Sequence, residues 1–377
     1  MKKDYLITAT CTFGLERVLK TEILKLGYEI AESSEGAVKI YGDITDVYRL
    51  NIWLRTSNRV LIQLGEGKAE SFDELFELVK SIDWASYLPS DAKCNVSKIT
   101  CVKSKLFSKS DCQRIIKKAL SERLSKSYGF TRLPETGAEY PLFVTIKNDH
   151  VQLNLNTSGE SLHRRGYRLA KGEAPLKETL AAGIILLSYY HGQCEFADIM
   201  CGSGTIIIEA ALIAANRPPG INRQFAFEKW DLLTEKDQNN VKMEIESRTF
   251  QIKHRILGSD IDGSVLKNAR ENAERAGVSD DVSIQKLDFR EFKSKKYNGL
   301  IVTNPPYAER IGEFKKTEKL YKDMSVLVES LNNWDISVLC GYSEFQRAFG
   351  RKADKNRKLF NGDMLTYLYQ YQGMKKI

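Results

Sequence analysis

The sequence lacks the cysteine and histidine patterns of a disulfide framework or a metal site. Its 7 cysteines are odd in number, and no two of them have the Cys-x-x-Cys spacing. The 4 histidines include no pair spaced as metal ligands. These absences exclude a zinc ribbon and a disulfide-stapled secreted domain, and they predict a chain that binds no metal ion and works in the reducing cytoplasm.

The sequence also lacks a long hydrophobic run, an internal repeat and a low-complexity tract. Its longest apolar run, from Leu180 to Tyr190, is much shorter than the roughly 20 residues that span a bilayer. Polar residues interrupt the N-terminal segment where a signal peptide would need an apolar core. With 42% hydrophobic and 28% charged residues among 377, the composition predicts a cytoplasmic globular chain of two or three domains with no membrane anchor.

Positive charge is concentrated in two segments. The net charge is +8, yet residues 1–92 carry more acidic than basic side chains, whereas residues 93–147 carry 12 Lys and Arg against 4 Asp and Glu. A second basic cluster runs from Arg347 to Lys358. Two such segments favour a phosphate-rich partner, although each of them alone is also compatible with a solvated charged surface.

Hydrophobic periodicity divides the chain into three predicted domains. Residues 1–60 alternate short strands with amphipathic helices, and residues 61–158 repeat this α+β pattern around a basic helix expected from Asp111 to Ser125. Residues 159–377 alternate strands and helices in an order typical of a doubly wound sheet, with an antiparallel end whose edge strand is expected from Met364 to Tyr371. The expected fold is an α/β, Rossmann-like domain preceded by two α+β domains.

The segment Asn304-Pro305-Pro306-Tyr307 follows a buried-strand pattern from Gly299 to Thr303. An exocyclic base amine shares its lone pair with the ring, so it needs a group that holds it in an sp3-like geometry before it can attack. The Asn304 side-chain oxygen and the Pro305 carbonyl oxygen could each accept one N–H, while Tyr307 offers a flat face for a flipped base. The segment predicts methyl transfer to a planar amine, although alone it is also compatible with an ordinary turn.

A glycine loop lies upstream of this segment. A short strand ends at Asp198, Gly202 and Gly204 follow, and an apolar helix is expected from Ile206 to Ala215. Ile207 replaces the third glycine of a dinucleotide fingerprint, which argues against a pyrophosphate ligand. S-adenosylmethionine has no phosphate, and it needs close backbone approach at the two glycines and a carboxylate, Asp198, near its charged amino-acid end.

Carboxylates at two further strand ends complete the predicted cofactor site. Asp260 could accept both ribose hydroxyls, whereas Asp262 is better suited to cap the next helix, expected from Ser264 to Ala276. Asp288 could accept the adenine amino group while Phe289 packs on the ring. Asp288 is also compatible with a simple turn.

Six segments together resemble the THUMP-domain-containing RNA guanine-N2 methyltransferases over nearly the whole chain: Ser104–Leu106, Gln113–Ala119, Leu162–Arg168, Ala174–Ala182, Asp198–Thr205 and Asn304–Tyr307. The chain is most similar to the bacterial enzymes that form N2-methylguanosine in 23S ribosomal RNA. The resemblance implies a ferredoxin-like domain at 1–60, a THUMP RNA-binding domain at 61–158 and a class I methyltransferase domain at 159–377.

The resemblance also implies the residues that do the work. It places the target amine at Asn304, Pro305 and Tyr307, and it implies S-adenosylmethionine binding by Asp198, Cys201, Gly202, Gly204, Asp260, Asp288 and Asn304. A structured RNA partner would contact Lys103, Lys105, Arg114, Lys117, Lys118, Arg164, Arg165 and Arg168. The segment from Arg164 to Arg168, with Tyr167, would also help to join the domains.

Two departures from the family pattern are visible. Ile199 and Met200 stand where the family usually has Asp-Pro, and the chain ends at Ile377 without the second methyltransferase domain of some members, so we expect no second activity. The alternatives are a transfer RNA guanine-N2 methyltransferase, an amino-methyltransferase acting on DNA adenine or on a protein glutamine, and an RNA-binding protein with a degenerate catalytic domain. The sequence predicts no particular oligomeric state.

Overall fold

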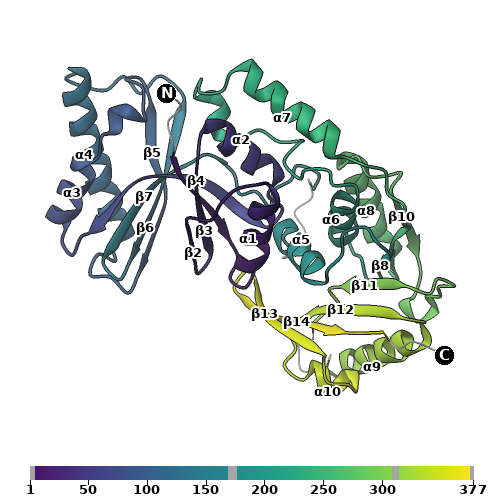
Figure 1. Cartoon of the computed structure of the whole chain (residues 1–377). Helices are drawn as coiled ribbons and strands as arrows, with labels where there is room; N and C mark the ends of the chain where they lie inside the picture. Colours follow the sequence, from purple (N-terminus) through teal and green to yellow (C-terminus); the bar gives the residue numbers. More distant parts are fainter. Residues whose placement is uncertain (1–4, 169–175, 308–313, 374–377) are drawn as a thin grey trace.

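The computed structural model describes residues 5–168, 176–307 and 314–373 and contains two seven-stranded sheets (Figure 1). The first sheet comes from the N-terminal half of the chain, and the second comes from the C-terminal half. Mixed α/β layers around two sheets agree with the predicted fold class.

The first sheet has the strand order β2-β3-β1-β4-β7-β6-β5, and only β5 and β6 pair in parallel. The strand β4 pairs with β1 along its first part and with β7 along its second part. The boundary predicted between residues 60 and 61 therefore lies inside a continuous strand. The strands are β1 (Tyr5–Cys11), β2 (Glu32–Ser34), β3 (Ala37–Gly42), β4 (Ser57–Lys68), β5 (Lys93–Val102), β6 (Glu139–Lys147) and β7 (His150–Asn156).

Helices pack on both sides of this sheet. Helices α3 and α4 contact each other and cover β4 and β5, whereas α1 and α2 lie toward the C-terminal half (Figure 1). Local residues set their ends, because Asp43 caps α2 in a reciprocal capping box and Gly129, with a φ of +71°, ends α4. The helices are α1 (Glu16–Lys25), α2 (Ile44–Trp53), α3 (Phe72–Ser81), the short 3-10 helix η1 (Trp84–Ser86) and α4 (Lys109–Tyr128).

The second sheet has the order β10-β9-β8-β11-β12-β14-β13, with β10 to β12 parallel and β14 antiparallel to both neighbours. This confirms the predicted parallel sheet with an antiparallel end. The chain builds outward from β8 to β10 and then returns to β11 on the other side of β8, so the direction reverses where such sheets bind ligands. The strands are β8 (Glu195–Asp198), β9 (Ile256–Asp260), β10 (Val282–Lys286), β11 (Gly299–Thr303), β12 (Trp334–Cys340), β13 (Lys355–Asn361) and β14 (Met364–Tyr371).

The predicted edge strand from Met364 to Tyr371 is wrong in one respect. This strand, β14, lies between β12 and β13, and β13 forms the edge. The segment of β13 belongs to the basic cluster that ends at Lys358, and its charges mask the alternation of a strand. Charged side chains are common on edge strands because they discourage pairing with another chain.

Helices cover both faces of the second sheet. Leu300 and Val302 of β11 point to the cluster beneath α5 and α6, while Ile301 points to the cluster beneath α9 and α10. Helix α5 begins at Glu178, inside the family-like segment from Ala174 to Ala182, and residues 174 and 175 lie outside the described residues. The helices are α5 (Glu178–Leu187), α6 (Thr205–Ala214), α8 (Gly263–Arg275), η3 (Phe289–Glu291), α9 (Phe314–Ser330) and α10 (Phe345–Phe349).

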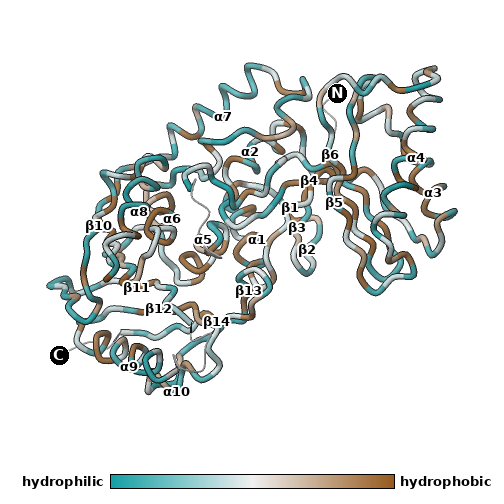
Figure 2. Tube along the Cα trace, turned by 180° about the vertical axis from the view of Figure 1, so that it is seen from behind, coloured by the Kyte–Doolittle hydropathy of each residue, from teal (hydrophilic) through white to brown (hydrophobic). Residues whose placement is uncertain are grey.

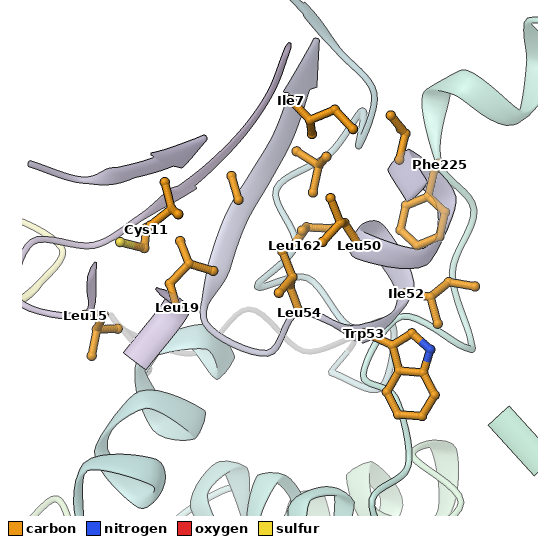
Figure 3. Packing of buried hydrophobic residues seen from close by; sticks show 14 of the residues in the cluster. Ile7, Cys11, Leu15, Leu19, Leu50, Ile52, Trp53, Leu54, Leu162 and Phe225 are labelled. Atoms are coloured by element: carbon orange, nitrogen blue, oxygen red, sulfur yellow. The ribbon is translucent and has the colours of Figure 1, made fainter. Parts of the chain in front are cut away.

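One hydrophobic cluster joins the two halves of the chain. It extends from β1 and α1 to α5 and α6, and Figure 3 shows Leu162 beside Leu50 and Leu54. Figure 2 shows hydrophobic residues concentrated along the strands and α6, whereas much of α7 is hydrophilic. A continuous core of this kind fixes the orientation of the N-terminal half against the second sheet.

The segment between α6 and β9, residues 216–255, crosses back to the N-terminal half. It contains η2 (Ala226–Lys229) and α7 (Glu235–Arg248). Arg49 of α2 forms a salt bridge of 2.7 Å with Glu244 of α7, and Trp230 stacks on Tyr140 of β6 with ring centroids 4.6 Å apart. This segment, for which the sequence predicted no role, ties both halves of the chain together.

Candidate active site

The carboxyl ends of β8 and β9 hold the glycine loop. Cys201 N–H donates to the Ser259 carbonyl (2.9 Å), and Gly202 N–H donates to the Asp260 carboxylate (2.9 Å). Gly202 and Gly204 have φ values of +51° and +85°. A Cβ at Gly204 would lie 3.1 Å from a side chain of α8, whereas a Cβ at Gly202 would meet nothing within 4 Å. The Gly202 backbone therefore borders open space that a ligand can occupy.

Asp198 ends β8 in the protein interior. Its side chain is 1% exposed, and its Oδ1 accepts hydrogen bonds from the Thr303 hydroxyl (2.7 Å) and the Met200 N–H (3.2 Å). Burial raises the pKa of the Asp198 carboxyl to about 7, and the nearby charge of Asp260 also raises it. A buried carboxylate in this setting is stabilised by any cation placed beside it.

The Asn304 turn, residues 304–307, follows β11. The Tyr307 hydroxyl donates a hydrogen bond to Asn304 Oδ1, and the Tyr321 hydroxyl of α9 donates to the Pro306 carbonyl (3.1 Å). Within the described part of the chain, no group donates to the Pro305 carbonyl oxygen. The turn thus offers two adjacent acceptors, one of which holds a hydroxyl in this conformation.

Thr303 connects the glycine loop with the Asn304 turn. It is the last residue of β11, it precedes Asn304 directly, and its hydroxyl is bonded to Asp198 across the two neighbouring strands. A ligand above Gly202 would therefore lie at the same end of the sheet as the two acceptors. This arrangement suits the transfer of a group from a cofactor on the loop to an amine on the turn.

Comparison with protein families agrees with this arrangement. A ferredoxin-like domain of the RlmL type matches residues 7–61, a THUMP domain matches residues 69–156, and an RMKL-like methyltransferase domain matches residues 165–370. The last match covers more than half of the chain.

The chain belongs to the RMKL-like methyltransferase family.

Two curated relatives show how far the similarity extends. A Bacillus subtilis protein described as a candidate RNA methyltransferase, YpsC, is 42% identical over 98% of this chain and 96% of that protein. The ribosomal RNA large subunit methyltransferase K/L of Marinobacter nauticus is 31% identical over 96% of this chain. The chain spans only about half of that relative, 52% of its length.

Two solved structures have the same fold over the whole chain. A candidate methyltransferase in complex with SAH is 38% identical, with a TM-score of 0.94 and full coverage of both chains. A Listeria monocytogenes protein described as a predicted N6-adenine-specific DNA methylase is 41% identical, with a TM-score of 0.93 over 99% of this chain and 97% of that chain. This RMKL-like methyltransferase depends on S-adenosylmethionine. SAH, S-adenosylhomocysteine, is what remains of this cofactor after it has given up its methyl group.

The residues of the glycine loop fit that cofactor. Gly202 leaves room for close approach, and the buried Asp198 carboxylate suits a positively charged amino group. Asp260 accepts one backbone N–H on each oxygen, from Gly202 (2.9 Å) and Asp262 (3.0 Å), so its predicted ribose contact would use the remaining lone pairs. Asp262 caps α8 through the Ser264 N–H (2.8 Å), which confirms its predicted structural role.

One residue of this site escaped the sequence prediction. Ile261, between Asp260 and Asp262, is 65% exposed at the carboxyl end of β9. A large apolar side chain so exposed beside a ligand site is available to cover an apolar ring. The sequence feature that could have identified Ile261 is its position between two carboxylates at the end of a strand. The strand pattern alone assigns such an isoleucine to the core.

One predicted cofactor contact conflicts with the structure. Phe289 is 5% exposed and packs in the cluster beneath α9, with the Arg290 guanidinium 4.7 Å from its ring centroid, so its ring is not free to cover adenine. Asp288 pairs with Arg290 (2.9 Å), and its predicted contact with the adenine amino group stays a prediction. The Cys201 side chain is also buried. Its sulfur lies close to Gly258 of β9, where an added Cβ would be 3.2 Å away. Cys201 supports the loop from below.

The predicted RNA-binding residues near α4 are exposed. Acidic neighbours accompany several of them, since Lys105 pairs with Glu70 and Arg114 with Asp111. Their contact with RNA stays a prediction for this methyltransferase. The exposed residues are Lys103, Lys105, Arg114, Lys117 and Lys118.

The three arginines between β7 and α5 have different environments. Arg164 is exposed and pairs with Glu160 (2.8 Å). Arg165 is 3% exposed and pairs with the buried Glu209 (3.3 Å), so its prediction as an RNA contact is wrong. It donates instead to the Arg55 carbonyl and joins the halves of the chain.

Arg168 lies close to the glycine loop. It pairs with the buried Glu178 of α5 (3.1 Å), and its Nη1 is 3.4 Å from the hydroxyl of Thr205, the first residue of α6. Burial raises the pKa of the Glu178 carboxyl to about 7, and the Arg168 charge partly opposes this. Arg168 therefore connects the first turn of α5 with the first residue of α6, and its predicted contact with RNA stays a prediction.

In the ranges 5–168, 176–307 and 314–373, no three His, Cys, Asp or Glu side chains form a group suited to a metal ion. None of the described helices has the length and apolar character needed to cross a membrane.

Proposed function

We propose that this chain transfers a methyl group to the exocyclic N2 amine of a guanosine in RNA, and that the RNA is 23S ribosomal RNA. The observation that carries the proposal is the hydrogen bond between Thr303 and Asp198, which joins the Asn304 turn to the glycine loop. RNA as substrate is supported by the THUMP match and by the descriptions of the Bacillus and Marinobacter relatives.

The two acceptors of the Asn304 turn would activate the amine. S-adenosylmethionine supplies an electrophilic methyl group on its sulfonium. Asn304 Oδ1 and the Pro305 carbonyl each accept one N–H of the amine, which turns the nitrogen lone pair toward the methyl carbon. Neither amide oxygen is a useful base, so the surplus proton of the methylated nitrogen passes to water. The chain contributes positioning and fixed dipoles, and no covalent intermediate is needed.

Tyr307 would have to release Asn304 before the amine binds. Its hydroxyl donates a hydrogen bond to Asn304 Oδ1. Its ring lies near Gly341, directly after β12, since a Cβ added at Gly341 would be 3.5 Å from the ring. Burial raises the pKa of the Tyr307 phenol, so it remains a hydrogen-bond donor at neutral pH. The target amine competes with this hydroxyl for one acceptor, and the displaced ring can then stack on the base.

Product analysis tests the proposal. The purified chain is incubated with labelled S-adenosylmethionine and, separately, with undermodified 23S ribosomal RNA, transfer RNA and duplex DNA, and each nucleic acid is digested to nucleosides. We expect labelled N2-methylguanosine from 23S ribosomal RNA. The same product from transfer RNA alone would keep the mechanism and replace the substrate.

The strongest alternative is methylation of adenine N6 in DNA. It is favoured by the description of the Listeria structure and by the fit of the Asn304 turn to any planar amine. Labelled N6-methyladenine from the duplex, with none in either RNA, would replace our proposal with this one. Absence of label in all three nucleic acids, despite cofactor binding, would favour an RNA-binding protein without catalysis.

Cofactor binding is expected to weaken below pH 7. Asp198 has a pKa of about 7 in this structure because of burial, and a neighbouring ammonium would lower it, so protonation opposes binding. The dissociation constant of S-adenosylmethionine should be about tenfold higher at pH 6 than at pH 8, measured by titration calorimetry. Asp198→Asn should bind weakly at both pH values, with a much flatter profile. An unchanged pH profile in this variant would contradict the ammonium contact.

A further inference from the structure

A cleft of about 730 Å³ lies between the first sheet and the segment 216–255. Strands β4, β5 and β6 provide its floor, and residues 224–229 provide a wall. Its lining includes the cations Arg59, Lys98 and Lys229, the polar or aromatic residues Phe143 and Asn156, and the acidic residues Glu139 and Glu160. The volume is in the range of pockets that hold small-molecule-sized ligands.

This cleft lies on the face of the sheet that α3 and α4 leave uncovered. Val96 and Leu142 are buried on the opposite face, which α4 covers. There, Gln113 of α4 donates a hydrogen bond to the Val96 carbonyl (2.9 Å). The pairing of β5 with β6 shifts by one residue after Val96, so that Lys98 aligns with Phe143. This bulge brings Ser97 and Lys98 to the open face together.

Cations surround an aromatic ring on this floor. The Arg59 guanidinium is 4.6 Å and the Lys98 ammonium is 5.6 Å from the Phe143 ring centroid. Among the described residues, no acidic side chain forms a salt bridge with Arg59 or Lys98. Burial lowers the pKa of Lys98, and the positive charges of Arg59, Lys177 and Lys109 lower it further. The two acidic side chains of the lining, Glu139 and Glu160, pair with Lys93 (3.1 Å) and Arg164 (2.8 Å). Arg59 and Lys98 therefore carry positive charge without a direct ion-pair partner among the described residues.

Asn156 adds an unused acceptor to the cleft. The residue is 2% exposed, and its Nδ2 donates to the Gly159 carbonyl (2.7 Å). Its buried Oδ1 has no hydrogen-bond partner in the described part of the chain. A buried amide oxygen without a partner is costly, so a ligand that brings an N–H or O–H donor would be stabilised here.

We propose that this cleft binds a single-stranded segment of the substrate RNA, with a base stacked on the Arg59–Phe143 pair and an adjacent phosphate at Lys98. The inference rests on the RNA substrate proposed above. A nucleotide combines negative charge, a flat ring and N–H or O–H donors, which match the cations, the aromatic floor and the Asn156 oxygen. An acidic peptide would satisfy the charges alone.

Equilibrium binding of a fluorescent single-stranded oligouridylate to the full chain tests the inference. Lys98→Gln should weaken binding and reduce the slope of log affinity against log salt by about 0.7, because one phosphate contact is lost. Phe143→Leu should weaken binding about fivefold or more with an unchanged slope, and Phe143→Tyr should bind like the parent chain. Thermal unfolding of each variant checks that the fold is retained.

The matched control lies on the opposite side of the same sheet. Lys126→Gln removes one exposed positive charge from α4 at a residue with no assigned RNA contact, and we expect normal oligouridylate binding and an unchanged salt slope. Loss of binding in Lys117→Gln or Lys118→Gln, the α4 residues that the family resemblance implies, with normal binding in Lys98→Gln and Phe143→Leu, would place the RNA on α4 and overturn the inference. Competition by polyglutamate as strong as that by unlabelled oligouridylate would also overturn it, in favour of an unspecific anion site.

Product analysis separates this inference from the proposed function. N2-methylguanosine formed by the parent chain, together with normal oligouridylate binding by both cleft variants, would remove the cleft inference alone. Binding that depends on Lys98 and Phe143, without methylated nucleoside from any RNA, would support the cleft and remove the proposed reaction.

Discussion

Asn304→Ala should reduce methyl transfer by about 100- to 1000-fold, a range typical for the loss of one preorganised polar group at a reacting atom. The substitution removes the side-chain oxygen that accepts one N–H of the amine, so the lone pair stays conjugated with the ring. The dissociation constant of S-adenosylmethionine should stay within a few fold. Single-turnover transfer of labelled methyl measures the first effect, and titration calorimetry measures the second.

Two companion variants define the role of Asn304 more sharply. Asn304→Asp keeps a side-chain acceptor and should retain part of the activity. Tyr307→Phe keeps the ring but removes the hydroxyl that competes for Asn304 Oδ1, so transfer should be maintained. Loss of cofactor binding in Asn304→Ala would instead assign Asn304 to the cofactor, the other role that the family resemblance implies.

The sequence predicted those parts of the site that depend on local order along the chain. The strand ending at Asp198, the glycines at 202 and 204, and the Asn304 turn each occupy their expected place after a strand. A parallel sheet brings the carboxyl ends of its strands to one edge, so these motifs had to meet. Contacts made by single side chains were less predictable. Phe289 shows this, because its ring packs beneath α9, a helix that follows it in the sequence, and not toward the cofactor.

Burial of charge could not be predicted from the neighbouring residues. Arg164 and Arg165 are adjacent and look equivalent in sequence, yet only Arg164 reaches solvent. The difference comes from Glu209, which is 44 residues away and meets Arg165 only when α6 packs against the first half. The strand β4 was divided for the same reason, since its partners β1 and β7 are far apart in sequence.

Arg165 and Glu209 form a buried pair whose disruption should destabilise the whole chain. Their side chains are 2% and 0% exposed, Tyr167 also donates to Glu209 (3.1 Å), and Arg165 donates to the Leu162 carbonyl (2.8 Å). Glu209→Ala leaves the Arg165 charge buried without a counter-charge, which typically costs about 3–5 kcal/mol. We expect a large fall in the midpoint of urea unfolding, which tryptophan fluorescence measures.

The adjacent surface pair supplies the control, because Glu160 and Arg164 differ from Glu209 and Arg165 mainly in burial. Their side chains are 68% and 63% exposed, so Glu160→Ala should cost no more than about 1 kcal/mol.

Replacing both buried partners, as Arg165→Met with Glu209→Leu, should recover much of the stability lost in Glu209→Ala, since no unpaired charge remains. Equal destabilisation by Glu160→Ala and Glu209→Ala would contradict a structural role for the buried pair. A stable double variant that still binds the oligouridylate but transfers methyl slowly would show that the pair also sets the orientation between the RNA-binding half and the Asn304 turn.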